Sequence, residues 1–208
     1  MKRFLVPSLA LALTCLKLAG CASLSPRSDP SRFFVLSLLP EVEEAQNLDT
    51  PGQLSLGVGP IKFPAYLDRE QMVTRVAQNR FELSENDRWA ERLEENFTRV
   101  LSQNLSALLR TGRIIPYPWA GNKPPNYQVQ IEVLRFEANA AQDGQLLARW
   151  AVLDGSDKKP LHYRESHLTH PAKSKTTEAA VASLSEAVGD LSREIADAIR
   201  AVDRQRRP

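Results

Sequence analysis

Cysteine and histidine are scarce in this sequence of 208 residues, with two of the first and three of the second. The histidines lie close together, at His162, His167 and His170. Two metal ligands three positions apart suit one face of a helix, whereas this stretch has the pattern of a strand that runs into a loop. We therefore interpret all three as surface histidines, and the sequence predicts no metal site and no cofactor.

Catalytic motifs are also missing. The sequence has no Gly-x-Ser-x-Gly, no phosphate-binding loop, no dinucleotide-binding glycine pattern and no His-Glu-x-x-His. Residues 156–159 match the Ser-x-x-Lys spacing of penicillin-recognising enzymes, but they form a polar turn without the companion Lys-Thr-Gly. The paired carboxylates Glu94 and Glu95 fall on the solvated face of an expected helix. We expect no enzymatic activity.

Long apolar runs are limited to residues 4–18, and this stretch is too short to remain as a membrane-spanning helix. It follows the basic residues Lys2 and Arg3 and leads into Leu-Ala-Gly-Cys, the pattern that lipoprotein processing enzymes recognise. We therefore expect residues 1–20 to be a secretory signal and Cys21 to carry a diacylglyceryl thioether. The alternative is an ordinary cleaved signal followed by an incidental cysteine.

Removal of this signal changes the charge and the thiol content of the chain. Three of the 27 basic residues lie in it, so the mature chain has 24 against 25 acidic residues and no electrostatic footprint for nucleic acid. Cys15 leaves with the signal and Cys21 is blocked by lipid, so no disulfide is expected. Ala22 and Ser23, rather than an aspartate, follow the lipidated residue, which favours the outer membrane with the domain facing the periplasm.

The remaining chain is expected to form a tether followed by one domain. Residues 21–31 hold the lipidated cysteine and a polar tether, whose ten residues reach at most about 35 Å. Residues 32–208 are long enough for a single domain with a hydrophobic core. Alternation and turn residues predict strands at 32–38, 54–58, 72–76, 81–83, 113–117, 127–133, 145–153 and 161–168.

Two long amphipathic helices are expected, over residues 87–110 and 177–203. Asp87 is the expected N-cap of the first helix, and Gly112 is the expected stop. The order of strands, helix, strands, helix predicts an α+β fold, in which both helices pack on a largely antiparallel mixed sheet.

The segment between the second and third expected strands has an unusual composition. The glycine–proline pair at residues 59–60 should end a strand, and residues 61–69 should form an irregular connection. Its last four residues, Tyr66–Arg69, mix aromatic, apolar and charged side chains, as protein interfaces do. A tight crossover that closes over the sheet edge is the alternative interpretation.

Several short motifs of this segment and of the rest of the chain resemble one known family. They are Gly59-Pro60, Pro64–Arg69, Val73–Arg75, Asn79 and Arg88–Glu91, with the Leu-Ala-Gly-Cys motif, Phe34–Leu36 and Leu191–Ala196. As a set they are similar to the paraquat-inducible protein C family (PqiC, also YmbA), the auxiliary lipoprotein component of ABC-type transport and MCE systems. Phe34 stands where the family is expected to have tyrosine, which leaves the strand prediction unchanged.

The resemblance implies a non-enzymatic role in moving lipids between the inner and outer membranes, in support of envelope integrity. The lipoprotein would sit at the outer membrane and dock a PqiB-like MCE-domain protein that spans the periplasm, and through it an inner-membrane permease and ATPase. A homo-oligomer, such as a ring around a tunnel end, would suit this role. The docking residues that we predict are Tyr66, Leu67, Asp68, Arg69, Arg75, Arg88 and Trp89.

Three other functions remain open on the sequence alone. A periplasmic lipid-binding carrier would need an apolar cavity of its own. An envelope hydrolase would need a nucleophile and a base in a cleft. A structural lipoprotein for outer-membrane assembly would differ from a transport component in its genomic neighbours.

Overall fold

A computed structural model gives the structure of the chain. The residues that it describes are 29–40, 42, 54–119 and 124–206. The chain divides into a unit over Met1–Pro30 and a second, compact unit over Ser31–Pro208, and the fold is that of the second unit. The expected signal, Cys21 and most of the expected tether lie outside the described residues.

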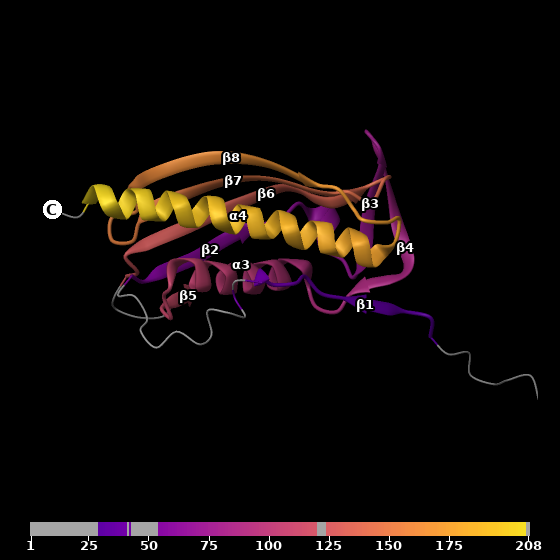
Figure 1. The fold of residues 1–208 in the computed structure, drawn as a ribbon, viewed down its shortest axis with the longest axis horizontal. Coiled ribbons are helices and arrows are strands. Elements are labelled where there is room, and N and C mark those ends of the chain that lie inside the picture. The colour runs from indigo at the N-terminus through magenta and orange to yellow at the C-terminus, as the bar shows by residue number, and fades with distance from the viewer. Residues whose placement is uncertain (1–28, 41, 43–53, 120–123, 207–208) are drawn as a thin grey trace, which may run out of the picture. The chain divides into compact units, whose positions relative to one another are not determined.

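The second unit is built on one mixed sheet of eight strands (Figure 1). The strands are β1 (Arg32–Phe34), β2 (Leu56–Lys62), β3 (Gln71–Ala77), β4 (Arg80–Trp89), β5 (Ile114–Pro116), β6 (Tyr127–Asn139), β7 (Gly144–Asp154) and β8 (Pro160–His170). Their spatial order is β1-β4-β3-β6-β2-β5, and β7 and β8 extend the sheet from β6.

The three longest strands, β6, β7 and β8, form an antiparallel meander joined by short turns. Along β7 the alternate residues Leu146, Ala148 and Trp150 are buried, as the alternation in the sequence predicts. The pairings of β1 with β4, of β2 with β5 and β6, and of β3 with β6 are parallel and shorter than those of the meander. The prediction of a largely antiparallel mixed sheet is therefore confirmed.

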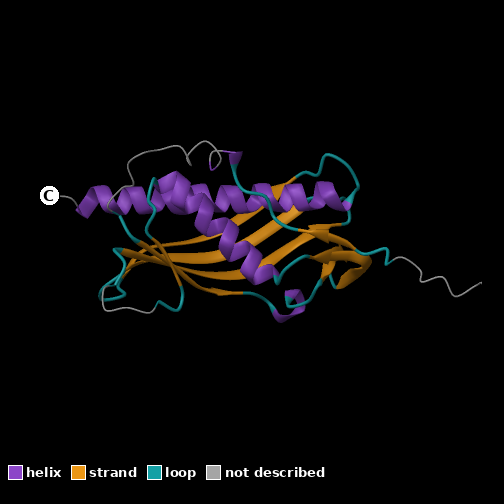
Figure 2. Cartoon of the chain, turned by 90° about the horizontal axis from the view of Figure 1, so that it is seen from below, coloured by secondary structure: helices purple, strands orange, loops and turns teal. Residues whose placement is uncertain are grey.

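Two long helices, α3 (Leu93–Leu109) and α4 (Thr177–Arg206), cover the same face of the sheet (Figure 2). Each helix buries an apolar stripe with spacings of three and four residues, so the predicted α+β architecture is confirmed. The stripe of α4 contains Val181, Leu184, Val188, Leu191, Ile195, Ile199 and Val202. Within the described ranges, neither helix is long and apolar enough to cross a membrane.

The expected start of the first long helix is wrong, because β4 occupies the first residues of that segment. Asp87, the expected N-cap, lies in β4 and accepts hydrogen bonds from Nε of Arg32 (2.7 Å) and Oγ1 of Thr177 (2.5 Å). Burial raises the pKa of Asp87, but these hydrogen bonds outweigh burial and hold the pKa below its usual value. At the other end, α3 stops at Arg110 in a left-handed conformation, before Gly112.

The glycine–proline pair at residues 59–60 does not end β2, contrary to the prediction. The register of β2 against β6 shifts between Val58 and Ile61, and this irregularity accommodates a proline that has no N–H to donate. Gly59 has a φ of 119°, and a Cβ added there would lie 2.6 Å from Cβ of Tyr117. Only glycine fits this position. β2 continues to Lys62, and the irregular connection starts after that residue.

β1 is shorter than the predicted strand over residues 32–38. In the segment after it, backbone N–H groups donate to side chains and not to a neighbouring strand. The N–H of Leu36 donates to Oδ1 of Asn96 (2.9 Å), and the N–H of Leu39 donates to Oδ1 of Asn104 (3.0 Å). Both asparagines are fully buried on α3. They satisfy backbone groups that would otherwise be buried without an acceptor.

We expect Asn104→Ala to lower the free energy of unfolding by about 2–3 kcal/mol. The substitution leaves the N–H of Leu39 without its acceptor and removes the hydrogen bond from Nδ2 to Oγ of Ser192 (3.2 Å). Gln103→Ala, at the exposed neighbouring position, should change the stability by less than about 0.5 kcal/mol. Urea denaturation of both variants measures the difference, and equal stabilities would contradict the role of Asn104.

Candidate functional site

The predicted docking loop, around Tyr66–Arg69, follows β2 and lies beside the start of α3, because Asp68 and Arg69 line one pocket with Arg92 and Leu93. It contains the 3₁₀ helix η2 (Ala65–Leu67), which is closed by hydrogen bonds from the N–H groups of Leu67 and Asp68 to carbonyls three residues earlier. Nε of Arg69 donates to the carbonyl of Tyr66 (2.9 Å). The loop is therefore a compact turn in which the side chains have defined directions.

A buried carboxylate fixes this loop to the sheet. Glu137 of β6 has no exposed side-chain surface, and it accepts hydrogen bonds from the hydroxyl of Tyr66 (2.6 Å) and from Nε of Arg75 on β3 (2.7 Å). Nε of Arg135 lies 3.7 Å from the same carboxylate. Two cations and one hydroxyl thus surround the buried charge and compensate for its loss of hydration.

Tyr66 and Arg75 also hold Phe81 of β4 between them. The rings of Tyr66 and Phe81 are stacked with centroids 4.7 Å apart, and the guanidinium of Arg75 lies 4.2 Å from the centroid of Phe81. Burial and the hydrogen bond to Glu137 raise the pKa of the Tyr66 hydroxyl, which therefore remains a proton donor. These two predicted docking residues connect the loop, the β3–β4 hairpin and the sheet.

Two other predicted docking residues belong to the hydrophobic core. The side chains of Leu67 and Trp89 are buried, with exposures of 3% and 6%. They support the loop from beneath and present no surface to a partner. The predicted residues that face solvent are Asp68, Arg69 and, in part, Arg88.

An open pocket of about 370 Å³ lies between the loop, β1 and the start of α3. The ring of Phe33 lines one side, while Asp68 and Arg69 line the other. Arg92 approaches Asp68 with a nitrogen–oxygen distance of 3.3 Å. The pocket thus places an exposed aromatic ring beside fixed charges, a combination typical of protein interfaces.

A second cavity, of about 320 Å³, lies between the β3–β4 hairpin and the start of α4. Apolar side chains such as Met72, Phe136 and Leu184 form part of its wall. Asp87 and Glu137 belong to the wall as well, but the side chain of Glu137 has no exposed surface. A purely apolar ligand would have to lie against the charge of Asp87.

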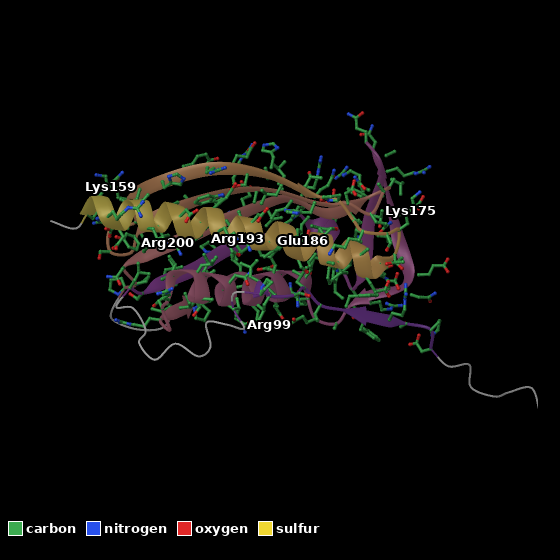
Figure 3. The ribbon with its side chains drawn as sticks, in the orientation of Figure 1. Arg99, Lys159, Lys175, Glu186, Arg193 and Arg200 are labelled. Carbon is green, nitrogen blue, oxygen red and sulfur yellow. The ribbon has the colours of Figure 1, made fainter. Side chains whose placement is uncertain are left out.

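The exposed face of α4 is charged, and Glu186, Arg193 and Arg200 mark it (Figure 3). Arg193 and Arg200 pair with acids one turn away, Asp190 (2.9 Å) and Asp197 (2.7 Å). Such pairs at a spacing of three residues are typical of a solvated helix face. The charges of Arg193 and Arg200 are therefore compensated within the helix itself.

The histidines lie on β8, which continues past the predicted strand end at residue 168 and so includes His170. Nε2 of His167 is 2.8 Å from Glu165, and Nε2 of His170 is 2.9 Å from Asp190. In the part of the chain that the structure describes, no three residues of the ligating types are grouped to hold a metal ion.

The sequence did not reveal Glu137 as the centre of the site. The strand that became β6 was expected to end at Val133, before Glu137 is reached. The one sign of a special role for Glu137 in the sequence was its position between the apolar residues Phe136 and Ala138. A charged residue so placed lies on one face of the strand. Nothing local indicates that Tyr66 and Arg75, far away in the sequence, lie against that face.

Comparison with known families gives one match over most of the described chain. The model of the family described as the ABC-type transport auxiliary lipoprotein component matches residues 34–196. The matched range includes the docking loop, the β3–β4 hairpin, α3 and most of α4. No curated protein matches the chain significantly.

Two solved structures share the fold at low sequence identity. An uncharacterized protein has a TM-score of 0.66 and 17% identity, over 81% of this chain and 98% of its own. A Xanthomonas campestris protein of the DUF330 family has a TM-score of 0.64 and 16% identity, over 84% of this chain and 98% of its own. Similarity at this level of identity supports the architecture alone.

Proposed function

Because this chain belongs to the family of ABC-type transport auxiliary lipoprotein components, we propose that it serves an MCE-type lipid transport system at the outer membrane. In this proposal the domain docks the end of a periplasm-spanning, PqiB-like MCE-domain protein, which connects to an inner-membrane permease and ATPase. The family match confirms the resemblance of the sequence to the PqiC and YmbA proteins. The MCE partner and the outer-membrane location extend that match and belong to the proposal.

The observation that carries the docking proposal is a rigid, exposed loop beside an aromatic ring. Asp68 and Arg69 face solvent, while Tyr66 in the same loop is fixed by Glu137. A preordered loop loses little conformational entropy when a partner binds it. Charges at the rim of an interface steer a partner into register, and the pocket beside them gives the partner a recess to enter.

Lipidation of Cys21 supplies the location in this proposal. One fatty chain gives only marginal membrane binding, whereas two or three chains on one residue hold a protein effectively permanently. The family is one of lipoproteins, which supports the processing signal that ends at Cys21. The domain would thus remain near the membrane while it holds its partner.

A lipid-binding carrier is the second candidate, and the cavity of about 320 Å³ favours it. The charge of Asp87 in the wall makes that cavity a poor match for an acyl chain. Docking therefore explains the site better. Recombinant protein that copurifies with phospholipid in a fixed ratio would favour the carrier instead.

Reversing the charges of Asp68 and Arg69 tests the docking surface. We expect Asp68→Lys with Arg69→Glu to reduce capture of the purified MCE-domain partner by about tenfold or more, because both rim charges then repel their counterparts. Pull-down by the membrane-extracted lipoprotein measures the capture.

The matched control reverses Asp157 and Lys159, an exposed pair on the turn between β7 and β8. Capture by this control should equal that of the parent chain. Full capture by a stable, correctly localised Asp68/Arg69 variant would refute the loop as the docking surface.

A further inference from the structure

The outward side chains of β1 are more apolar than the fold requires. Phe33 and Val35 are 63% and 48% exposed, while Phe34 and Leu36 between and beyond them pack on the core. A strand at a solvated surface usually places polar side chains outward. β1 also ends the spatial order of the described strands, with β4 as its neighbour. We call Phe33 and Val35, which lies one residue beyond the end of β1, the β1 ridge.

The β1 ridge is held rigidly in place. Nε of Arg32 donates to Asp87 (2.7 Å), and the N–H of Ala90 donates to the carbonyl of Phe34 (2.9 Å). On the other side of the ridge, the N–H of Leu36 is bound by a buried asparagine of α3. Because the ridge is already ordered, a contact made by it costs little additional conformational entropy.

The ridge is the part of the domain closest along the chain to the proposed lipid anchor. Twelve residues lead from Cys21 to Phe33, and a chain of this length spans at most about 40 Å. The domain is at least as long as α4, whose 30 residues extend about 45 Å. The connection from Cys21 to Phe33 is therefore shorter than the domain. β1 lies at the end of the domain where α4 begins, because Asp87 joins Arg32 to Thr177 (Figure 1). A bilayer that holds the anchor is thus always within reach of the ridge.

Two cations beside the ridge, Arg32 and Arg92, are already paired within the domain. Arg32 contacts Asp87 (2.7 Å) and Glu178 (3.1 Å), and Arg92 contacts Asp68 (3.3 Å). A contact made by the ridge is therefore driven by burial of apolar area and not by attraction between charges. The interfacial region of a bilayer takes up aromatic and aliphatic side chains in this way, to a depth of about 5–10 Å.

We propose that the β1 ridge inserts into the interface of the membrane that holds the Cys21 anchor, as a second point of attachment. This inference rests on the lipid anchor of the proposed function. One attachment point leaves a domain able to tilt, whereas two points select the face that meets the bilayer. Because Phe33 also lines the pocket beside Asp68 and Arg69, a docked partner would meet the domain at the bilayer surface, where transported lipid must enter or leave.

Fluorescent labels on single cysteines test this proposal in the full-length lipoprotein, reconstituted in phosphatidylcholine vesicles that contain lipids with headgroup nitroxides. A bimane label at Phe33→Cys or Val35→Cys should lose most of its fluorescence through quenching by the nitroxides. The matched control Tyr163→Cys replaces another exposed aromatic residue, 65% exposed on β8, and should keep its fluorescence. Added salt should leave the quenching unchanged, because screening acts on charges and not on apolar contacts.

Equal fluorescence at all three positions would overturn the proposal. So would quenching that disappears in high salt, or an unquenched ridge label that crosslinks to a second copy or to the MCE partner. Flotation of the variants with vesicles reports the anchor separately, and failure to float would refute the anchor together with the ridge. Capture of the partner by Asp68 and Arg69 is a different measurement, so failure of docking and failure of insertion are distinguishable.

Discussion

Replacing Glu137 with alanine should lower the free energy of unfolding by about 3 kcal/mol. The carboxylate is completely buried, and its loss leaves Nε of Arg75 and the hydroxyl of Tyr66 without their acceptor. The Arg75 side chain is 21% exposed, so water compensates in part and the effect lies at the lower end of the range for buried ion pairs. Urea denaturation of the variant and the parent chain measures the loss.

Glu165→Ala is the matched control for this substitution. Glu165 pairs with Arg149 at 2.7 Å, but both side chains are accessible to water, so its removal should cost less than about 0.5 kcal/mol. Glu137→Ala should also speed amide hydrogen exchange in the loop around Tyr66, because its link to β6 is lost. Equal stability losses in the two variants, with unchanged exchange in the loop, would contradict the central role of Glu137.

The periodicity of the sequence predicted the elements that depend on periodicity alone. Alternation predicted the first part of β6, turn residues bounded β7 and β8, and spacings of three and four residues predicted α4, because burial of one face is the main term that forms a strand or helix of this kind. Element boundaries depended on distant groups instead. Asp87 lies in a strand because Arg32 and Thr177 bind it, and Asn104 replaces a strand partner for Leu39. No local pattern contains those contacts.

The candidate site was predictable to a similar extent. Composition indicated a loop of interface character at Tyr66–Arg69, and the structure places such a loop on the sheet. Composition did not separate the side chains that support the loop from those that face a partner. Tyr66 is 71 positions from Glu137, and the hydrogen bond between them exists only after β6 and the loop have folded together. Exposure of an aromatic or charged side chain depends on contacts between residues that are distant in the sequence. A local sequence pattern therefore does not predict it.

The substitution with the largest expected effect on function is Cys21→Ser, which should abolish membrane anchoring by lipid. A serine hydroxyl at this position offers no thiol for the diacylglyceryl thioether, so incorporation of labelled palmitate should fall to background. Each buried methylene contributes about 0.8 kcal/mol to attachment, so loss of all the chains removes the whole anchor. Packing of the domain, which involves no residue of the signal among the described contacts, should be unaffected.

Cys15→Ser is the matched control, because that cysteine lies inside the expected signal and leaves with it. This variant should match the parent chain in incorporation of palmitate, in flotation with membranes and in any complementation of envelope integrity. The two substitutions remove the same atom six positions apart, so only the processing site distinguishes them. If Cys21→Ser restored envelope integrity fully at native abundance, anchoring would be dispensable. The docking surface would then act from solution, and the β1 ridge would have no bilayer held beside it.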